Sequence, residues 1–283
     1  MVWREADVEP LSASPEGLSV ARAMVWRMAV TQLRASLLEA APKVGLRLWL
    51  AGSPGYVRIL QRAFPPPVSW YGPYTSFDSR FDSVVYMQGV EEDQLRRFLG
   101  FLSDTLFVET ALDEAWALDM HMRDVVDRTG TGDLVFRAKT YAGKPGEPEA
   151  AAELAGLVAA RAAHHPGINR AGLVVPVPAN PPREPHNLPE VLAVELARAI
   201  GRPCRLDVLV KTRPTNVKDL PNEEKLAALA DAYVVTGRLD GRSIVLVDDL
   251  LHSGSTLNHL GGLLRAAGTS DIIGFVATKT LRS

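Results

Sequence analysis

Uninterrupted apolar runs that alternate with helix-like segments dominate the second half of this 283-residue chain. A strand without polar alternation is buried on both faces, which is typical of a parallel sheet covered by helices. The alternation therefore predicts an α/β domain built on a parallel sheet. The apolar runs are AGLVVPVP, SIVLVDD and DIIGFVATK, at 171–178, 243–249 and 271–279. Helical composition lies at 147–165, 188–201, 222–232 and 254–268.

Three further segments complete the expected domain, and a polar stretch marks its expected start. LVFRAKTY, RLDVLVK and YVVTG are expected strands at 134–141, 205–211 and 233–237. DRTGTGD at 127–133 is small and polar and contains two glycines, so we expect a domain boundary there. The chain is thereby divided into residues 1–130 and 131–283.

The first part, residues 1–130, is expected to be a smaller α+β domain whose role the sequence does not indicate. Residues 17–41 have helical composition, and residues 91–106 form an amphipathic helical pattern that starts with acidic residues. Short apolar or alternating segments between them indicate strands. These segments are LRLWLA at 46–51, VSWY at 68–71 and SVVYMQ at 83–88.

Composition excludes several classes of function. The single cysteine, Cys204, has no partner for an internal disulfide, and the formal net charge is -2. That charge gives no support to a nucleic-acid partner, although such a partner stays open. We find no apolar run of about 18 residues, so no membrane span and no membrane partner is expected. A reducing, cytoplasmic setting fits this composition.

Two acidic residues at the end of a buried strand are the strongest functional signal. Asp248 and Asp249 follow the apolar run IVLV, and the loop LLHSGS leads from them into a helix. Backbone N–H groups at a helix start bind anions, and Gly254 allows a ligand to approach the backbone closely. Carboxylates repel phosphate, so the acids would serve another part of the ligand, such as vicinal hydroxyls, or act through a metal ion. The simpler alternative is that the serines and acids only cap the helix.

The segment 244–256 resembles the phosphoribosyl pyrophosphate (PRPP) motif of type I phosphoribosyltransferases. The resemblance implies that Asp248 and Asp249 contact the 2′ and 3′ hydroxyls of ribose. It also implies that the following loop binds the 5′-phosphate through His252, Ser253, Gly254, Ser255 and Thr256. The family usually has threonine at the position of His252, so this chain departs from the pattern there.

Residues 174–201 resemble, more narrowly, the segment after the first strand of the competence protein F (ComF) class. The P-V-P strand end lies at 176–178, and Asn187 matches the asparagine of that class. The resemblance spans about residues 134–283 and implies a pyrophosphate loop formed by Ala179, Asn180 and Arg183. The Arg-Gly-Phe of that class is replaced here by Glu-Pro-His at 184–186, and its zinc-binding cysteines are missing.

The resemblance also implies a mobile catalytic loop at 210–226, where Lys211, Arg213 and Lys218 lie. Cations there would neutralise the departing pyrophosphate together with Mg²⁺, which prefers oxygen ligands and phosphate oxygens. Lys139 and Arg137 are weaker candidates for the same role. Solvent exposure without any role is the alternative for each of these basic residues.

The implied function is a Mg²⁺-dependent pentosyl transfer in nucleotide metabolism. Ribose 5-phosphate would move from PRPP to a nitrogen acceptor that the sequence does not identify. The alternative is a non-catalytic protein of the same fold that binds PRPP or a nucleoside 5′-monophosphate, or that assists competence or DNA processing. A homodimer is left open.

Overall fold

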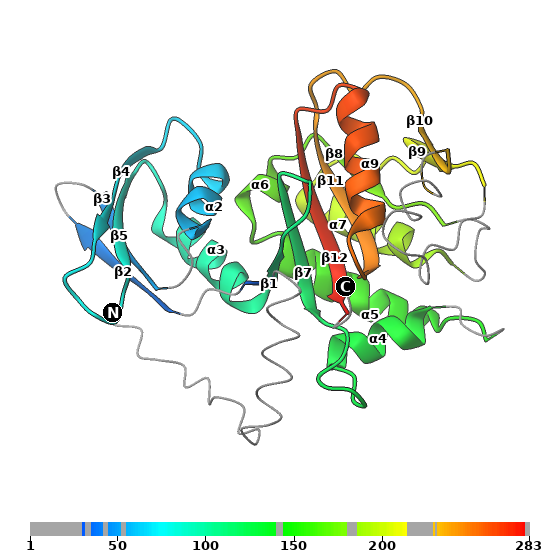
Figure 1. Ribbon diagram of the computed structural model, residues 1–283, viewed down its shortest axis with the longest axis horizontal. Helices are drawn as coiled ribbons and strands as arrows, with labels where there is room; N and C mark the ends of the chain where they lie inside the picture. The colour runs from blue at the N-terminus through cyan, green and yellow to red at the C-terminus, as the bar shows by residue number, and fades with distance from the viewer. Residues whose placement is uncertain are drawn as a thin grey trace.

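The computed structural model describes residues 30–31, 35–41, 45–51, 55–139, 144–179, 186–213, 229 and 231–280. Two sheets lie side by side, a small antiparallel one and a larger one dominated by parallel strands (Figure 1). Within these residues, no helix is long and apolar enough to cross a bilayer.

The larger sheet has six strands in the order β1-β6-β7-β12-β11-β8. Its core is parallel, because β7 pairs with β12, β12 with β11 and β11 with β8 in parallel register. The other two strands, β1 and β6, add an antiparallel edge. The bounds are β1 Val30–Thr31, β6 Leu106–Val108, β7 Glu114–Met120, β8 Leu173–Pro176, β11 Ser243–Leu251 and β12 Asp271–Lys279. The predicted parallel α/β architecture is therefore confirmed.

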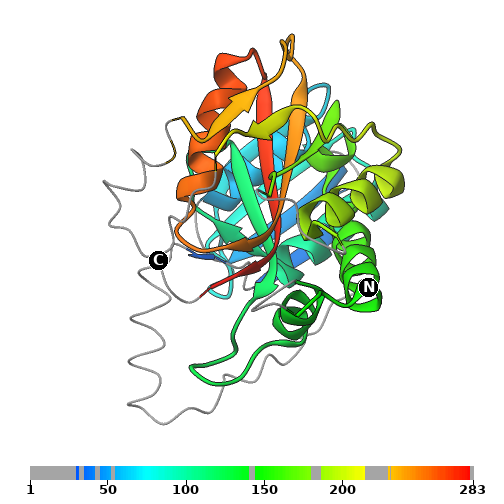
Figure 2. The same ribbon diagram turned by 90° about the vertical axis from the view of Figure 1, so that its right-hand side faces the viewer.

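Helices cover both faces of this sheet, which explains its uninterrupted apolar strands. Ile244 and Leu246 pack in the cluster that contains α9 (Ser255–Ala266). Val245 and Val247, which point the other way, pack with α4, α5 and α7. Figure 2 shows α9 on one side of the sheet and these other helices on the opposite side. Their bounds are α4 Gly130–Ala138, α5 Pro148–Ala162 and α7 Leu188–Ile200, and the short α6 spans Pro166–Asn169.

Two of the expected strands form a separate ribbon. The strands β9 (Leu209–Lys211) and β10 (Tyr233–Val235) pair antiparallel with each other and are not members of the six-stranded sheet. Both are strands as expected, but they are short. The helix expected at 222–232 lies almost entirely outside the described residues.

The smaller sheet has four antiparallel strands in the order β2-β3-β5-β4. The helices α2 (Gly55–Ala63) and α3 (Glu92–Asp104) lie between it and the larger sheet (Figure 1). The strands are β2 Ala35–Ala41, β3 Gly45–Ala51, β4 Ser69–Thr75 and β5 Ser83–Gln88. The helical prediction for 17–41 is wrong over 30–31, which form β1 and pair with β6, and over 35–41, which pair with β3 along their whole length. The rest of that segment lies outside the described residues.

The strand expected at 134–141 needs correction, because residues 134–138 belong to the helix α4; residues 140–141 lie outside the described part. Thr129 caps its first turn by accepting a hydrogen bond from Gly132 N at 2.9 Å. The polar stretch DRTGTGD is therefore a helix start, and Thr129 and Gly132 form its cap. A small polar segment has the same composition whether it links domains or begins a helix, and this ambiguity misled the sequence interpretation.

The boundary expected at 130–131 stays a prediction, and the sheet topology favours a different one. The strand β7 precedes that boundary, yet it pairs with β12 in the middle of the larger sheet. One core cluster runs from Phe98 and Phe101 on α3 to Trp116 on β7 and Phe275 on β12. We propose that the smaller unit ends near residue 104 and that the two units share this core.

Candidate ribose-phosphate site

The acidic pair lies where β11 loses one of its two neighbours. On one side, the pairing of β11 with β8 ends at Val247 and Pro176. On the other side, its pairing with β12 continues to Leu251 and Lys279. Asp248 and Asp249 therefore occupy a strand segment that is open on the side of β8. Ligands of parallel α/β sheets bind at this carboxyl edge.

The two carboxylates point to opposite faces of the sheet because side chains alternate along a strand. Asp249 lies on the face of α4 and is buried, with its Oδ1 atom 2.8 Å from Nζ of Lys139. Asp248 is half-buried and accepts a hydrogen bond from the Asp249 N–H at 2.8 Å. Lys139 directly follows α4, so the helix that replaced the expected strand is what brings its ammonium to the pair.

Burial raises the pKa of Asp248 to about 7, and the neighbouring charge of Asp249 acts in the same direction. The charges of Lys139 and Lys211 oppose this rise. Asp248 is therefore near the midpoint of its titration at neutral pH, which is unusual for a carboxyl group. Strongly shifted carboxyl groups cluster at functional sites.

The loop after the acids has the form expected of an anion cradle. Gly254 adopts φ 79°, a left-handed conformation, and ends the loop directly before α9. The hydroxyls of Ser253 and Ser255 are 2.9 Å apart, and His252 and Ser253 are exposed. Thr256 follows Ser255 in the first turn, so the sequence-predicted loop residues are brought together. Asn258 Oδ1 accepts from Ala111 N at 2.8 Å and fixes this turn to the loop before β7.

Two residues behind the loop were missed by sequence reasoning. Lys279 donates from Nζ to the carbonyl oxygens of His252 at 2.6 Å and Thr280 at 2.9 Å. The Oγ1 atom of Thr280 lies 3.2 Å from Nδ1 of His252. The available signal was a lysine that ends an otherwise apolar strand, DIIGFVATK.

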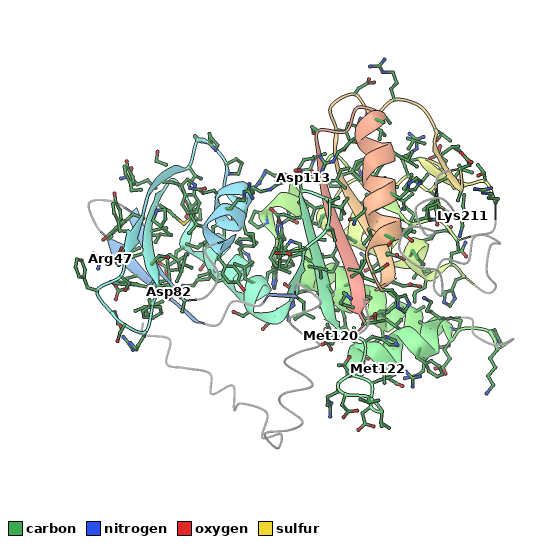
Figure 3. All side chains as sticks on the ribbon, viewed as in Figure 1. Arg47, Asp82, Asp113, Met120, Met122 and Lys211 are labelled. Carbon is green, nitrogen blue, oxygen red and sulfur yellow. The ribbon has the colours of Figure 1, made fainter. Side chains whose placement is uncertain are left out.

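His121, which follows β7, joins the site on the other side of β12. Its Nδ1 atom lies 3.2 Å from Oγ1 of Thr278, whose hydroxyl is 3.5 Å from the carbonyl oxygen of Asp249. Burial lowers the pKa of His121, and the charges of Arg128 and Lys139 lower it further. His121 is therefore neutral at neutral pH. Figure 3 labels Met120, the residue before it, at the carboxyl end of β7.

Only some of the basic residues that were expected to bind pyrophosphate lie in the described part of the chain. Lys211 ends β9, with Nζ 5.4 Å from the ring centroid of Tyr233, and its charge acts on Asp248. Arg213 is half-exposed and its guanidinium is 3.8 Å from the carboxylate of Asp231. Ala179 lies just beyond the end of β8. Asn180, Arg183 and Lys218 lie outside the described residues.

The donor groups of the described residues do not form a protein-only metal site. No group of three or more His, Cys, Asp or Glu side chains among them is arranged to hold a metal ion. Of the two acids at the edge, Asp249 is already paired with Lys139. Mg²⁺ would therefore need oxygen ligands from a bound phosphate and from water.

No family model and no curated protein matches this chain. Among solved structures, it is similar to a phosphoribosylpyrophosphate synthetase from Mycobacterium smegmatis, with 23% identity, 47% of this chain and 34% of that chain covered, and a TM-score of 0.28. A purine phosphoribosyltransferase from Pyrococcus horikoshii shares 14% identity over 46% of this chain and 85% of that chain, with a TM-score of 0.31.

A third structure, described as the allosteric regulatory enzyme of purine biosynthesis, shares 16% identity over 82% of this chain and 44% of that chain, with a TM-score of 0.36. The chain thus spans about a third of the first of these proteins and under half of the third. Because all three TM-scores are below 0.5, these similarities carry no argument about function, which is inferred from the site itself.

Proposed function

We propose that this protein binds PRPP and acts as a phosphoribosyltransferase that moves ribose 5-phosphate to a nitrogen acceptor. The observation that carries the proposal is the position of the acidic pair directly before a glycine-turned, hydroxyl-rich helix start, at the carboxyl edge of a parallel sheet. An anion cradle and two consecutive acidic residues at the same strand end suit a ligand that joins a phosphate to a diol.

In the proposed complex, the 5′-phosphate lies on the backbone of 253–256 and the ribose lies across the open segment of β11 beyond Pro176. A ribose there can meet Asp248 from one face of the sheet and Asp249 from the other. Because Asp249 is already paired with Lys139, ligand binding would place a hydroxyl beside an existing ion pair. A charge-assisted hydrogen bond contributes about 1.5–3 kcal/mol.

The transfer itself breaks the bond between ribose C1 and the pyrophosphate oxygen and forms a bond from C1 to the acceptor nitrogen, which releases its proton to pyrophosphate or water. Negative charge leaves with pyrophosphate while positive charge develops on the sugar ring. Fixed cations next to the leaving group stabilise this separation. We propose Lys211 and Arg213, with Arg183 and Lys218, for this role. Mg²⁺, when bound with PRPP, would neutralise the pyrophosphate oxygens.

The alternative is a protein of the same fold that binds PRPP or a nucleoside 5′-monophosphate without transfer. The Lys139–Asp249 ion pair favours it, because an acid that is already neutralised contributes less to a reaction that develops positive charge on the sugar. Release of pyrophosphate from PRPP, measured with a panel of purine and pyrimidine bases, separates the two functions. Binding without release would establish the alternative.

The decisive binding test compares a ligand that has a diol with one that has none. Asp248→Asn should lower the affinity for ribose 5-phosphate roughly ten-fold to a hundred-fold. The reason is that a hydrogen bond to a charged group contributes about 1.5–3 kcal/mol, and each ten-fold in affinity corresponds to about 1.4 kcal/mol. Inorganic phosphate has no diol, so its affinity should hold or improve. Calorimetry on both ligands measures this, with Asp207→Asn, an exposed acid distant in sequence, as the control. Equal losses for both ligands would remove the ribose role.

A further inference from the structure

Lys279 holds the first residue of the phosphate loop from inside the protein. Its side chain is buried, with 3% exposure, and its ammonium donates to the carbonyl oxygen of His252 at 2.6 Å. A second bond runs to the carbonyl oxygen of Thr280, and Thr280 N donates to the carbonyl oxygen of Leu251 at 3.0 Å. The end of β12 and the start of the loop are thereby fixed to each other.

This contact orients the backbone of the loop. In a trans peptide the carbonyl and the following N–H point in opposite directions. Because the His252 carbonyl points to Lys279, the N–H of Ser253, an exposed residue, points away from Lys279. A carbonyl turned outward would repel a phosphate, whereas an N–H donates to it.

The ammonium has no carboxylate partner within 4 Å among the residues that the structure describes. The ionisable groups on the elements around it are Asp119 on β7, Asp248 and Asp249 on β11, His252 in the loop, His121 after β7 and Lys139 after α4. Asp249 is paired with Lys139. Burial lowers the pKa of Lys279 to about 8. A buried cation without an anion beside it leaves a positive potential behind the loop.

We propose that Lys279 is the positioning residue of the phosphate loop and the buried counter-charge for the anion that the loop takes. This inference rests on the proposed function, and it adds a residue that contacts the loop rather than the ligand. Phosphate binding would then be coupled to protonation of the lysine, since a nearby dianion favours the charged form.

The test measures ribose 5-phosphate affinity by calorimetry between about pH 7.5 and pH 9.5. A phosphate monoester is a dianion throughout this range because its second pKa is about 6. The pKa of Asp248 is about 7, so this carboxyl group is mostly ionised across the range. The wild-type affinity should fall as pH rises, by at most about ten-fold per pH unit, because the neutral amine no longer supports the anion. A flat wild-type profile would overturn the inference without any variant.

Two substitutions separate charge from packing. Lys279→Met keeps an unbranched apolar stem but loses the ammonium, so affinity should fall roughly ten-fold to a hundred-fold and the pH dependence should disappear. Lys279→Arg retains a charge that does not titrate, so it should restore much of the affinity with a flat profile. Arg242→Met removes the same charge from an exposed residue before β11, at the opposite end of the strand, and should leave the wild-type profile.

The outcomes distinguish this inference from the proposed function. If the wild-type protein binds no ribose 5-phosphate at any pH, both fail. If it binds, and Lys279→Met binds equally well with the same pH profile, only the role of Lys279 fails. Thermal unfolding of each variant shows whether a loss of binding reflects a loss of folding.

Discussion

The guanidinium of Arg62, on α2 of the smaller unit, lies 3.1 Å from the carboxylate of Glu114, the first residue of β7 in the larger sheet. Glu114 is 3% exposed, and its other oxygen accepts from His165 at 2.9 Å and from Trp116 at 3.1 Å. Because Ile168 N donates to Nδ1 of His165, the proton of this imidazole is on Nε2, which donates to Glu114. Asp113, labelled in Figure 3, marks this amino edge of the sheet, opposite the proposed site.

Burial alone would raise the pKa of Glu114, but hydrogen bonds from His165 and Trp116 and the charge of Arg62 hold it below its usual value. Arg62→Met should therefore leave a buried carboxylate without its cation. We expect a loss of about 3–5 kcal/mol in the free energy of unfolding, as measured by urea denaturation. Arg80→Met breaks the exposed pair with Asp78 and serves as the control, with a change within about 1 kcal/mol.

The same contacts predict that the two units unfold together. A fragment that starts at residue 131 lacks β7, so it would expose the edge of β12 and one side of the aromatic core. We expect it to be insoluble or unfolded by circular dichroism, whereas the full chain unfolds in one transition by both tryptophan fluorescence and circular dichroism. A well-folded fragment would restore the boundary that the sequence suggested.

Asp248→Asn should stabilise the folded protein at neutral and higher pH. The pKa of Asp248 is raised in the folded state, so its ionisation opposes folding: stability falls as pH rises from the unfolded value of 3.8 to about 7 and stays low above that. The amide does not ionise, so the gain over wild type should be larger at about pH 8 than at about pH 5. Each kcal/mol gained raises Tm by on the order of 2–4 °C. If the variant exceeds the wild type in melting temperature by the same amount at both pH values, the pKa of Asp248 is not raised in the folded state.

Lys139→Met should destabilise the protein because it leaves Asp249 buried without its cation. The expected loss is about 3–5 kcal/mol at neutral pH. The double variant with Asp249→Asn should recover much of it, since no buried charge remains. A double-mutant cycle in urea measures this coupling. Additive losses would show that the two side chains do not interact in solution.

Gly254→Ala should impair phosphate binding through the backbone. An added Cβ would meet no atom closer than 3.8 Å. At φ 79°, however, any residue with a Cβ is strained, and this strain costs about 1–2 kcal/mol. Gly262→Ala, in α9 where an added Cβ meets nothing within 4 Å, should be neutral or stabilising by up to about 1 kcal/mol. Thermal unfolding and phosphate calorimetry compare the two variants. Equal phosphate affinity in both would show that the loop does not need its left-handed turn.

The sequence by itself determined the parallel core and the place of the proposed site. The strands within 171–178, 243–249 and 271–279 have central residues that are apolar without polar alternation because each strand is buried on both faces, and this pattern depends on local residues only. The acids and the glycine of the following loop were likewise visible, because a strand end, a short loop and a helix start follow one another along the chain.

Tertiary structure decided what depends on contacts between distant residues. The segment 134–141 has the composition of a strand, but Thr129 caps a helix that includes residues 134–138, and this helix places Lys139 against Asp249, 110 residues further on. Nothing in the residue pattern indicates that β7 inserts beside β12, because strand order comes from packing and not from composition. The role of Lys279 in positioning the loop depends on the place of the end of β12 behind the loop. The partners of Lys279 are backbone carbonyls, which every residue has, so no residue type in the sequence marks them.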